Sequence, residues 1–416
     1  MKIAIIGSGI SGLSCGYLLA KNHQLSVFEA GPTIGGHTAT KEIKVNGKDY
    51  AIDTGFIVFN DWTYPNFIRL MNEIGVQSKE TEMSFSVSCQ LSGLEYGGSN
   101  LNTLFAQRRN LLKPSYYKML ADIVNFNKQA IADLEQQRLD PAMTLAEYLS
   151  LKGYGKLFAD KYLIPMGSAI WSASTEVMLN FPLVFFVRFF KNHGLLSVNN
   201  RPQWRVIQGG SRQYLQPLSK DFSDRIRTNC PVQSVTRVEK GVQLALADGS
   251  IEHFDEVVFA CHSDQALALL SDATQQEQQI LGAMPYQEND VVLHTDESLL
   301  PTKKLAWSSW NYQLKSQQQE QATLTYNMNI LQGIESDTTF CVTLNATDDI
   351  DSDKILGRYQ YSHPVFSLAS VAATERWDDI NGVNNTWFCG AYWGNGFHED
   401  GASSGIRVAK ALGAQW

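Results

Sequence analysis

The chain has 416 residues, of which 44% are hydrophobic and 18% charged, as in folded globular proteins and unlike disordered ones. Its length predicts two domains, because single cores rarely grow to this size. The formal net charge of -8 argues against a nucleic-acid partner, since a phosphate backbone requires a cationic surface. The six cysteines are scattered without a CxxC pair, so we expect free thiols in a reducing compartment and no metal site.

The first residues do not resemble a targeting signal. Only four apolar residues, Ile3 to Ile6, separate Lys2 from Gly7, whereas a secretory signal needs about 7–15. No uninterrupted run of apolar residues is long enough to span a bilayer. We therefore expect a cytoplasmic protein.

The first 30 residues carry the pattern of a dinucleotide-binding unit. Residues 2–6 predict a buried strand, 12–21 a helix and 24–29 a second strand. At the first turn, one glycine permits a tight turn, one allows backbone N–H groups to approach a pyrophosphate, and one allows helix and strand to pack closely. An acidic residue ends the second strand, where it can accept hydrogen bonds from ribose hydroxyls. The predicted contacts are Gly7, Ser8, Gly9, Ile10, Ser11, Gly12, Glu29 and Ala30. This pattern alone does not distinguish NAD from FAD.

The segment that follows departs from a simple dehydrogenase. A glycine pair, Gly35-Gly36, precedes a β-hairpin whose Asn46-Gly47 turn predicts type I′ geometry. In a dehydrogenase, further βαβ units would follow instead. The glycine pair alone supports a flexible loop and a backbone against a flavin's ribityl-phosphate arm about equally. The cofactor contacts expected here are Gly35, Gly36, His37, Thr38, Thr54, Gly55 and Phe56.

Helical patterns then dominate residues 60–200, at 63–74, 115–136, 144–152 and 155–163. Thr144 and Glu147 form a capping box, and the region predicts an inserted, mostly helical substrate domain. Strands return at 232–238, 242–247 and 256–260. Val232 and Ala260 are expected to contact the adenosine, while a structural role is favoured for His262.

Two further regions complete the chain. Residues 275–375 predict strands with aromatic residues that favour a core over a cofactor cage, and these are Trp307, Trp310, Tyr312 and Tyr326. Near the C-terminus, Gly390 ends a short strand, and residues 401–405 are expected to open a helix of small residues. Such a helix start could donate backbone hydrogen bonds to a flavin, or its small residues could simply pack tightly. The predicted contacts are Gly390, Gly401, Ala402 and Ile406.

Together the GSGISG turn with Glu29, EAGPTIGGHT, IDTGF at 52–56 and the C-terminal FCG…HEDGASSG resemble the amine oxidase superfamily of flavoproteins. This resemblance implies FAD as cofactor and an α/β (α+β overall) fold. A Rossmann-like FAD-binding domain of the glutathione-reductase and amine-oxidase type would be interleaved with a mixed helical and β substrate domain. Residues 1–60, 200–272 and 376–416 would form the FAD-binding domain. Residues 61–199 and 273–375 would form the substrate domain.

Over its whole length, the chain resembles bacterial proteins usually labelled predicted NAD/FAD-binding oxidoreductases, through IPMGSAIWS, FFKNHGLL, RPQW…GGSRQY, CHSDQALALL, SSWNY and YWGNGFHEDG. That group is often encoded beside cyclopropane-fatty-acid-synthase-like methyltransferases. The resemblance implies a fatty acyl lipid substrate and a lipid methyltransferase partner. Five phenylalanines in residues 179–190 could form a tunnel wall or a peripheral contact with the inner membrane face, although a buried core helix is favoured.

The activity expected from this resemblance is hydride transfer between flavin N5 and an apolar substrate, an unsaturated or branched fatty acyl lipid. Such chemistry also requires an acid or base, for which the candidates are His398, Glu399 and Tyr392. Glu399 could instead cap the helix that follows it in the sequence. An amine oxidase and a non-catalytic, flavin-holding partner of a lipid methyltransferase remain as alternatives. An amine site would need an aromatic cage, for which the neighbours Tyr392 and Trp393 are poorly placed.

Overall fold

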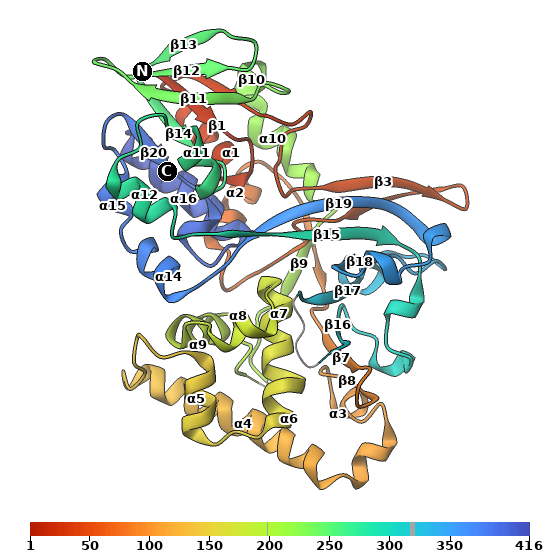
Figure 1. Cartoon of the computed structure of the whole chain (residues 1–416). Coiled ribbons are helices and arrows are strands. Elements are labelled where there is room, and N and C mark those ends of the chain that lie inside the picture. The colour runs from red at the N-terminus through yellow and green to blue at the C-terminus, as the bar shows by residue number, and fades with distance from the viewer. Residues whose placement is uncertain (198, 317–320) are drawn as a thin grey trace.

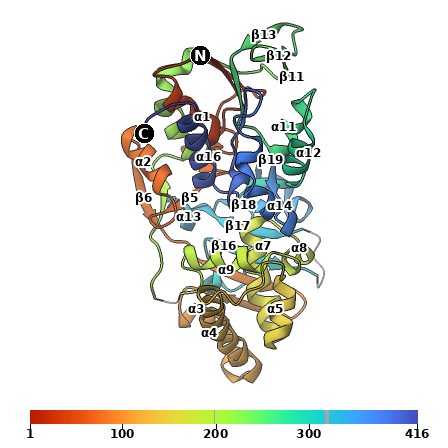
Figure 2. The ribbon, with the colours of Figure 1, turned by 90° about the vertical axis from the view of Figure 1, so that its left-hand side faces the viewer.

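A computed structural model describes residues 1–197, 199–316 and 321–416. Both termini lie at one end of the elongated molecule, and the helices α4 (Pro114–Glu135) and α5 (Leu145–Lys152) lie at the other. Two long strands, β15 (Tyr286–His294) and β19 (Ile355–Pro364), cross the middle (Figure 1). The view turned by 90° keeps the same order from end to end (Figure 2).

A parallel five-stranded sheet forms the upper end, in the order β10-β2-β1-β14-β20. Its strands are β1 (Lys2–Ile6), β2 (Gln24–Phe28), β10 (Ile226–Arg227), β14 (Glu256–Phe259) and β20 (Thr386–Phe388). Ile3 and Ile5 of β1 face one apolar cluster, with α1 (Ile10–Leu19) and α16 (His398–Ala411). Ala4 and Ile6 face the opposite cluster. Because side chains alternate along a strand, β1 is buried on both faces, and the expected Rossmann-like sheet is confirmed.

The second face is covered by an antiparallel sheet of β11 (Val232–Arg237), β12 (Val242–Leu246) and β13 (Ile251–Phe254), with α11 (Ser263–Leu269) and α12 (Gln275–Leu281). Strands predicted at 232–238, 242–247 and 256–260 are therefore present, and β13 was missed. Its IEHF sequence has one buried residue, Phe254, so it carries little of the apolar alternation that marks a strand.

The lower body is built on a seven-stranded sheet in the order β19-β15-β18-β17-β16-β7-β8. Besides β15 and β19, its strands are β7 (Phe85–Cys89), β8 (Leu94–Gly97), β16 (Trp310–Leu314), β17 (Thr323–Asn327) and β18 (Cys341–Leu344). β7 pairs in parallel with β16, more than 200 residues later in the chain. The sheet thus joins the two segments assigned to a substrate domain from sequence.

Smaller sheets connect the two bodies. The hairpin of β3 (Thr40–Val45) and β4 (Lys48–Asp53) turns at Asn46 and Gly47, whose φ angles of 50° and 78° confirm the type I′ turn. A three-stranded sheet pairs β9 (Trp204–Ile207) with β5 (Val58–Asn60) and with β6 (Ser78–Thr81). The mostly helical expectation for residues 60–200 therefore missed β6, β7 and β8. Their partners lie far away in the chain, and a local pattern does not reveal such pairing.

The predicted helices are present with shifted ends. They are α2 (Pro65–Glu73), α4, α5 with the expected Thr144–Glu147 capping box, and α6 (Lys156–Phe158) continued by the π-helix η2 (Ala159–Leu163). Beyond η2 the chain continues directly into α7 (Ile164–Trp171). Other helices are α3 (Leu101–Leu104), α8 (Thr175–Leu179), α10 (Leu215–Ser219), α13 (Met328–Leu331), α14 (Leu368–Thr374) and α15 (Trp377–Ile380).

The phenylalanine-rich segment is a core helix. α9 (Leu183–Asn192) buries Phe186, Phe189 and Phe190 around Trp171 of α7. Because these rings are at most 4% exposed, the suggestion that this segment contacts a membrane is wrong. Within the described residues, no helix combines the length and apolarity that crossing a bilayer would require.

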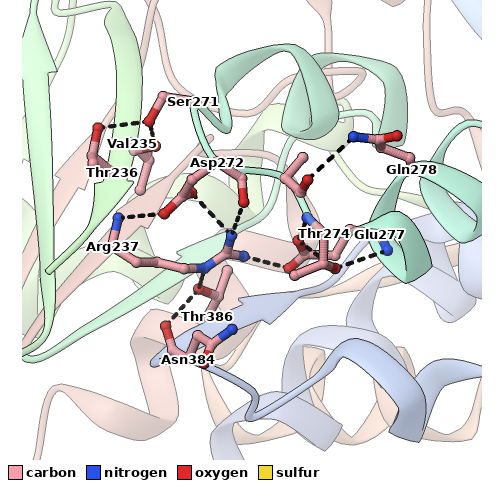
Figure 3. Close-up of polar contacts among 11 residues, drawn as sticks. Val235, Thr236, Arg237, Ser271, Asp272, Thr274, Glu277, Gln278, Asn384 and Thr386 are labelled. Atoms are coloured by element: carbon pink, nitrogen blue, oxygen red, sulfur yellow. Dashed lines mark hydrogen bonds and ion pairs between the residues drawn. The ribbon is translucent and has the colours of Figure 1, made fainter. Parts of the chain in front are cut away.

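One buried ion-pair network fastens the antiparallel sheet to its neighbours (Figure 3). The Arg237 guanidinium at the end of β11 pairs with Glu277 of α12 and, at 3.0 Å, with Asp272. Its Nε also donates to Thr386 Oγ1 of β20, at 3.0 Å. The Arg237 side chain is 10% exposed and that of Glu277 2%. This cation therefore links β11 and α12 to β20, an edge strand of the Rossmann sheet.

Replacing Arg237 by methionine should lower the free energy of unfolding by about 3–5 kcal/mol, because it leaves the Glu277 carboxylate buried without its cation. Denaturant unfolding monitored by tryptophan fluorescence measures this loss. Arg225→Met is the matched control, since Arg225 pairs with Asp224 at 3.8 Å where the carboxylate side chain is 82% exposed, and it should cost under about 1 kcal/mol. Equal losses in the two variants would contradict a specific role for the network.

Candidate functional site

A cavity of about 960 Å³ lies between the Rossmann sheet and the seven-stranded sheet. The turn after β1, the end of β2 and the loop after β14 line its nucleotide end. The predicted cofactor residues that line it are Gly7, Ser8, Gly9, Ile10, Ser11, Glu29, Ala30, Gly35, Gly36, His37, Gly55, Phe56, Val232, Ala260 and Gly390. Those outside its lining are Gly12, Thr38, Thr54, Gly401, Ala402 and Ile406. The lining therefore brings together residues from the four motifs expected to meet at one ligand, at 7–11, 29–37, 55–56 and 390.

The three glycines of the first turn have three different surroundings. Gly7 has a φ of +106°, and a Cβ there would lie 2.8 Å from the Ala260 oxygen. The tight turn therefore requires glycine at this position. A Cβ on Gly12 would lie 2.1 Å from the Gly7 oxygen, so Gly12 serves helix–strand packing. A Cβ on Gly9 would meet no protein atom within 4 Å. Gly9 is therefore the glycine whose open side faces the space for a ligand.

The start of α1 is suited to an anion. Its N-cap, Gly9, provides no side-chain hydrogen bond, and the first turn has no acidic residue. The helix N-terminus thus presents its partial positive charge to the cavity without a competing carboxylate from the helix itself. This is the arrangement that binds the pyrophosphate of a dinucleotide.

Glu29 holds the neighbouring loops in place. One carboxylate oxygen accepts from Ser8 N at 3.1 Å and Ser8 Oγ at 2.5 Å, and the other accepts from Gly31 N at 2.8 Å. The oxygen that accepts from Gly31 keeps a second lone pair, which a ribose hydroxyl could use. The residues of this end therefore fit an adenosine diphosphate moiety.

The Gly35-Gly36 pair is packed against the first turn. Gly35 N donates to the Ser8 oxygen at 3.0 Å, and Gly36 has a φ of +57° with a Cβ position only 3.2 Å from Gly9 Cα. A side chain at Gly36 would push this loop away from the first turn, and one at Gly35 would meet Leu215. The structure therefore favours the ligand-lining interpretation of the glycine pair over a flexible loop.

The C-terminal helix begins earlier than predicted. α16 starts at His398, and Gly401 N already donates to the Phe397 oxygen at 3.0 Å, so the expected helix start at Gly401 is wrong. A Cβ on Gly405 would lie 2.2 Å from the Ser11 oxygen, and one on Gly401 2.7 Å from Ile10 Cγ2. The small residues therefore bring α16 against α1, which is the packing alternative left open by the sequence. Direct cofactor contact by Gly401, Ala402 and Ile406 stays a prediction.

His398 lies in a buried network at the cavity wall. Its Nε2 is 3.1 Å from Thr38 Oγ1 and 3.0 Å from Tyr214 Oη, and these two hydroxyls also hydrogen-bond each other. The ring stacks on Phe56 with centroids 3.6 Å apart. Burial, together with nearby His37, lowers the pKa of His398 well below its usual range. The imidazole is thus neutral and held in position at neutral pH, and its role as acid or base stays a prediction.

The other two catalytic candidates have different surroundings. Glu399 accepts hydrogen bonds from the backbone N–H groups of Asn66 and Phe67 and does not line the main cavity. It therefore caps α2 rather than the helix that follows it, where Asp400 is the capping carboxylate. Tyr392 lines the cavity. Burial raises the pKa of Tyr392 well above its usual value, and among the described residues its hydroxyl has no partner of ordinary geometry. It is a buried donor that a bound ligand could satisfy.

The far half of the cavity lies in the lower body and was not predicted as a site. Its wall comes from β7, α7, α9, β16, β17 and the end of β19. Trp310 and Tyr326 were assigned to the core, yet both line the cavity, with ring centroids 5.2 Å apart and planes at 83°. Tyr312 lies on the same face of β16 as Trp310 and is core as expected, since it is 1% exposed and does not line the cavity. Alternation along β16 therefore gave no signal that Trp310 would line the cavity.

Apart from Glu29, the ionisable side chains that line the cavity are neutral at neutral pH. Glu29 is the one carboxylate in the lining, and no lysine or arginine of the described chain lines it. Burial lowers the pKa of His193 and of His262 to about 4 and that of His363 to about 3. The described residues also contain no group of three or more His, Cys, Asp or Glu side chains that could hold a metal ion. Away from Glu29, the cavity is therefore uncharged at neutral pH.

Gly9→Ala should leave the unfolding free energy of the apoprotein within about 0.5 kcal/mol of the parent, because its Cβ meets no protein atom. It should weaken binding of the expected dinucleotide at least about tenfold, since the methyl group fills space that a phosphate would approach. Titration of apoprotein with FAD measures the affinity. Gly405→Ala is the control and should instead destabilise the apoprotein by about 1–3 kcal/mol. Unchanged FAD affinity in Gly9→Ala would place the pyrophosphate elsewhere.

Comparisons with known proteins agree with this geometry. The family of flavin containing amine oxidoreductases matches residues 10–329, whereas a search of curated proteins finds no match. The fold is similar to that of putrescine oxidase bound to putrescine, with a TM-score of 0.71, 14% identity and 99% of both chains covered. Cyclohexylamine oxidase from Brevibacterium oxydans IH-35A has a TM-score of 0.70, 16% identity and coverage of 99% of this chain and 98% of that chain.

A CLA-producing fatty acid isomerase from P. acnes is also similar, with a TM-score of 0.69, 14% identity and the same coverage of 99% and 98%. At these identities the solved structures show a shared fold and no shared substrate. The family match covers most of the chain, including Glu29 and the glycine pair. The chain therefore belongs to the flavin-containing amine oxidoreductase family and is an FAD-dependent oxidoreductase.

Proposed function

We propose that the substrate is an apolar, uncharged chain, namely the unsaturated or branched acyl chain of a lipid. The observation that carries this proposal is the uncharged far half of the cavity. A charged group placed there would lose its hydration without gaining an ionic partner, which costs several kcal/mol. The part of the substrate that enters is therefore neutral.

The shape of the wall supports the same conclusion. Met166, Ile170 and Phe189 contribute flexible and aromatic surface to the far half, and Leu331 and Phe366 extend it. Such a surface binds hydrocarbon through burial of apolar area. Among proteins of similar fold, one is a fatty acid isomerase, which is in keeping with an acyl substrate. A carboxylate or head group would remain outside this half, because no lysine or arginine of the described chain lines the cavity.

Bound FAD would supply hydride exchange at its N5 atom. The chain itself supplies position and exclusion of water. His398, fixed by Thr38, Tyr214 and Phe56, and the Tyr392 hydroxyl are the groups at the wall that could hold a proton. The direction of the reaction, oxidation of the acyl chain or its reduction, is left to the experiment.

Amine oxidation is the second candidate, and one observation favours it. Trp310 and Tyr326 form an edge-to-face pair in the cavity, and aromatic faces attract cations. Tyr392 and Trp393 do not provide such a cage, because Trp393 lies outside the cavity lining. The far half of the cavity has no carboxylate, however, and therefore disfavours an amine in its protonated, cationic form.

Anaerobic spectra of the flavin distinguish these candidates. We expect phospholipid with unsaturated or methyl-branched acyl chains to bleach the oxidised flavin band, or to restore it after reduction by NADPH or dithionite. Putrescine and cyclohexylamine should do neither. Bleaching by the amines would support the amine oxidase instead. No response to either class would support a flavin-holding partner of a lipid methyltransferase.

A carboxylate introduced into the wall tests the neutral cavity directly. Met166→Asp should slow the reaction with acyl lipid at least about tenfold while FAD stays bound, because the new charge removes apolar contact and brings water. Leu151→Asp is the control, since Leu151 is 69% exposed and outside the cavity. Stopped-flow measurement of the flavin band gives the rates. A faster reaction of Met166→Asp with amines, without loss for lipid, would contradict the proposal.

A further inference from the structure

The end of the molecule farthest from the Rossmann sheet carries an unusual surface. Around the 3-10 helix η1 (Arg108–Leu112) and the start of α4, apolar and cationic side chains alternate on the outside. We call this the η1 surface, and it consists of Leu101, Arg108, Arg109, Leu111, Leu112, Lys113, Tyr117 and Lys118. α3 and α4 lie at the lower end in both views (Figures 1 and 2).

The apolar members of the η1 surface are well exposed. Leu112 is 88% exposed and Leu101 72%, the two highest values among the exposed large hydrophobic residues of the described chain. Leu111 and Tyr117 are 45% and 48% exposed. Isolated exposed leucines are ordinary, but four large apolar side chains around one short segment mark a contact surface.

These side chains are held outward by an ordered segment. Beneath them Tyr116 is 1% exposed and donates from its hydroxyl to the Leu104 oxygen at 2.6 Å. Asn110 is fully buried, and the Tyr117 hydroxyl donates to the Leu111 oxygen at 3.0 Å. The backbone is thus anchored from below, and burying the leucines against the protein would require this packing to break.

The charge of the η1 surface is opposite to that of the whole chain. Residues 96–121 contain four cations and no Asp or Glu, in a protein of net charge -8. Within the described chain, no carboxylate lies within ion-pair distance of Arg108, Arg109 or Lys113. Arg108 instead donates to the oxygens of Asn102 and Phe105. Lys118 is the one cation of the surface with a partner, Asp122, at 2.9 Å.

We infer that the η1 surface docks on an anionic lipid membrane. Leucine and tyrosine side chains interleaved with unpaired arginine and lysine fit the boundary between acyl chains and negatively charged head groups. One feature favours a membrane over a second copy of the chain. In a symmetric pair, the four cations of one η1 surface would face the same four cations of the other. The docking inference stands on the surface itself and does not depend on the proposed substrate.

If the substrate is an acyl lipid, the position of the η1 surface also determines which end of the molecule meets the lipid. The η1 surface belongs to the lower body, which also supplies the apolar half of the cavity, through β7, α7 and β16. Docking by this end would bring the substrate-binding body, rather than the nucleotide-binding end, to the lipid. This connection rests on the proposed function.

Sedimentation with vesicles tests the inference on the FAD-loaded protein. Vesicles of phosphatidylcholine with about a third phosphatidylglycerol should bind it, pure phosphatidylcholine should bind it at least about fivefold more weakly, and salt should reduce binding. Arg108→Glu/Arg109→Glu and Leu111→Ser/Leu112→Ser should each weaken binding at least about tenfold. The two pairs remove charge and apolar contact separately.

Matched controls lie at the opposite end. Lys220→Glu/Lys240→Glu is the control for the change of charge. Ile251→Ser/Val383→Ser is the control for the loss of exposed apolar side chains. All four residues are exposed and lie outside the η1 surface. Both should bind vesicles like the parent, and all variants should keep the flavin spectrum. Failure of the parent to bind anionic vesicles, or parent-like binding by both η1 pairs, would overturn the inference. So would a dimer in light scattering that the η1 variants convert to a monomer, because a second copy would then occupy the surface. Vesicle binding is measured without turnover, so a wrong substrate proposal leaves this result unaffected.

Discussion

The nucleotide end depends on a backbone-to-backbone contact between α1 and α16. Gly405 comes so close to Ser11 of α1 that even a methyl group would overlap the Ser11 oxygen, at 2.2 Å. Gly12 makes a similar approach on the other side of α1, toward Gly7. Fixed between these contacts, the first turn of α1 cannot shift by the width of a side chain without breaking close packing. The glycines thus determine where an anion can bind before any ligand contact is considered.

The same contact places the start of α16 in the active site. Because Gly401 and Gly405 seat the helix on α1, its first residue, His398, reaches Thr38 and Phe56. His398 thus meets residues that lie more than 300 positions earlier in the sequence, at one wall of the cavity. Neutral His398, stacked on Phe56, keeps this wall free of charge.

Sequence reasoning succeeded where the structure is local. The first βαβ unit, the tight turn at Gly7 and the close packing at Gly12 are present as predicted, and ligand contacts of Gly9 and Glu29 stay predictions. It failed where partners are distant. The strand at 85–89 exists because β16, more than 200 residues later, pairs with it, and Trp310 became a wall residue through the same pairing. The start of α16 was misplaced because Gly401 suggested an opening, whereas Asp400 caps the helix through the Phe397 N–H at 2.9 Å.

Charged groups are distributed differently at the nucleotide end, in the far half of the cavity and on the η1 surface. Carboxylate and helix dipole meet at the nucleotide end, around Glu29 and the start of α1. The far half of the cavity has no charged side chain among the described residues. Under the proposed function it would exclude charged groups, because it could not solvate them. Unpaired cations instead gather outside, on the η1 surface. A lipid would therefore meet attraction at the surface and only apolar contact within, which lets a long chain enter without its charged group.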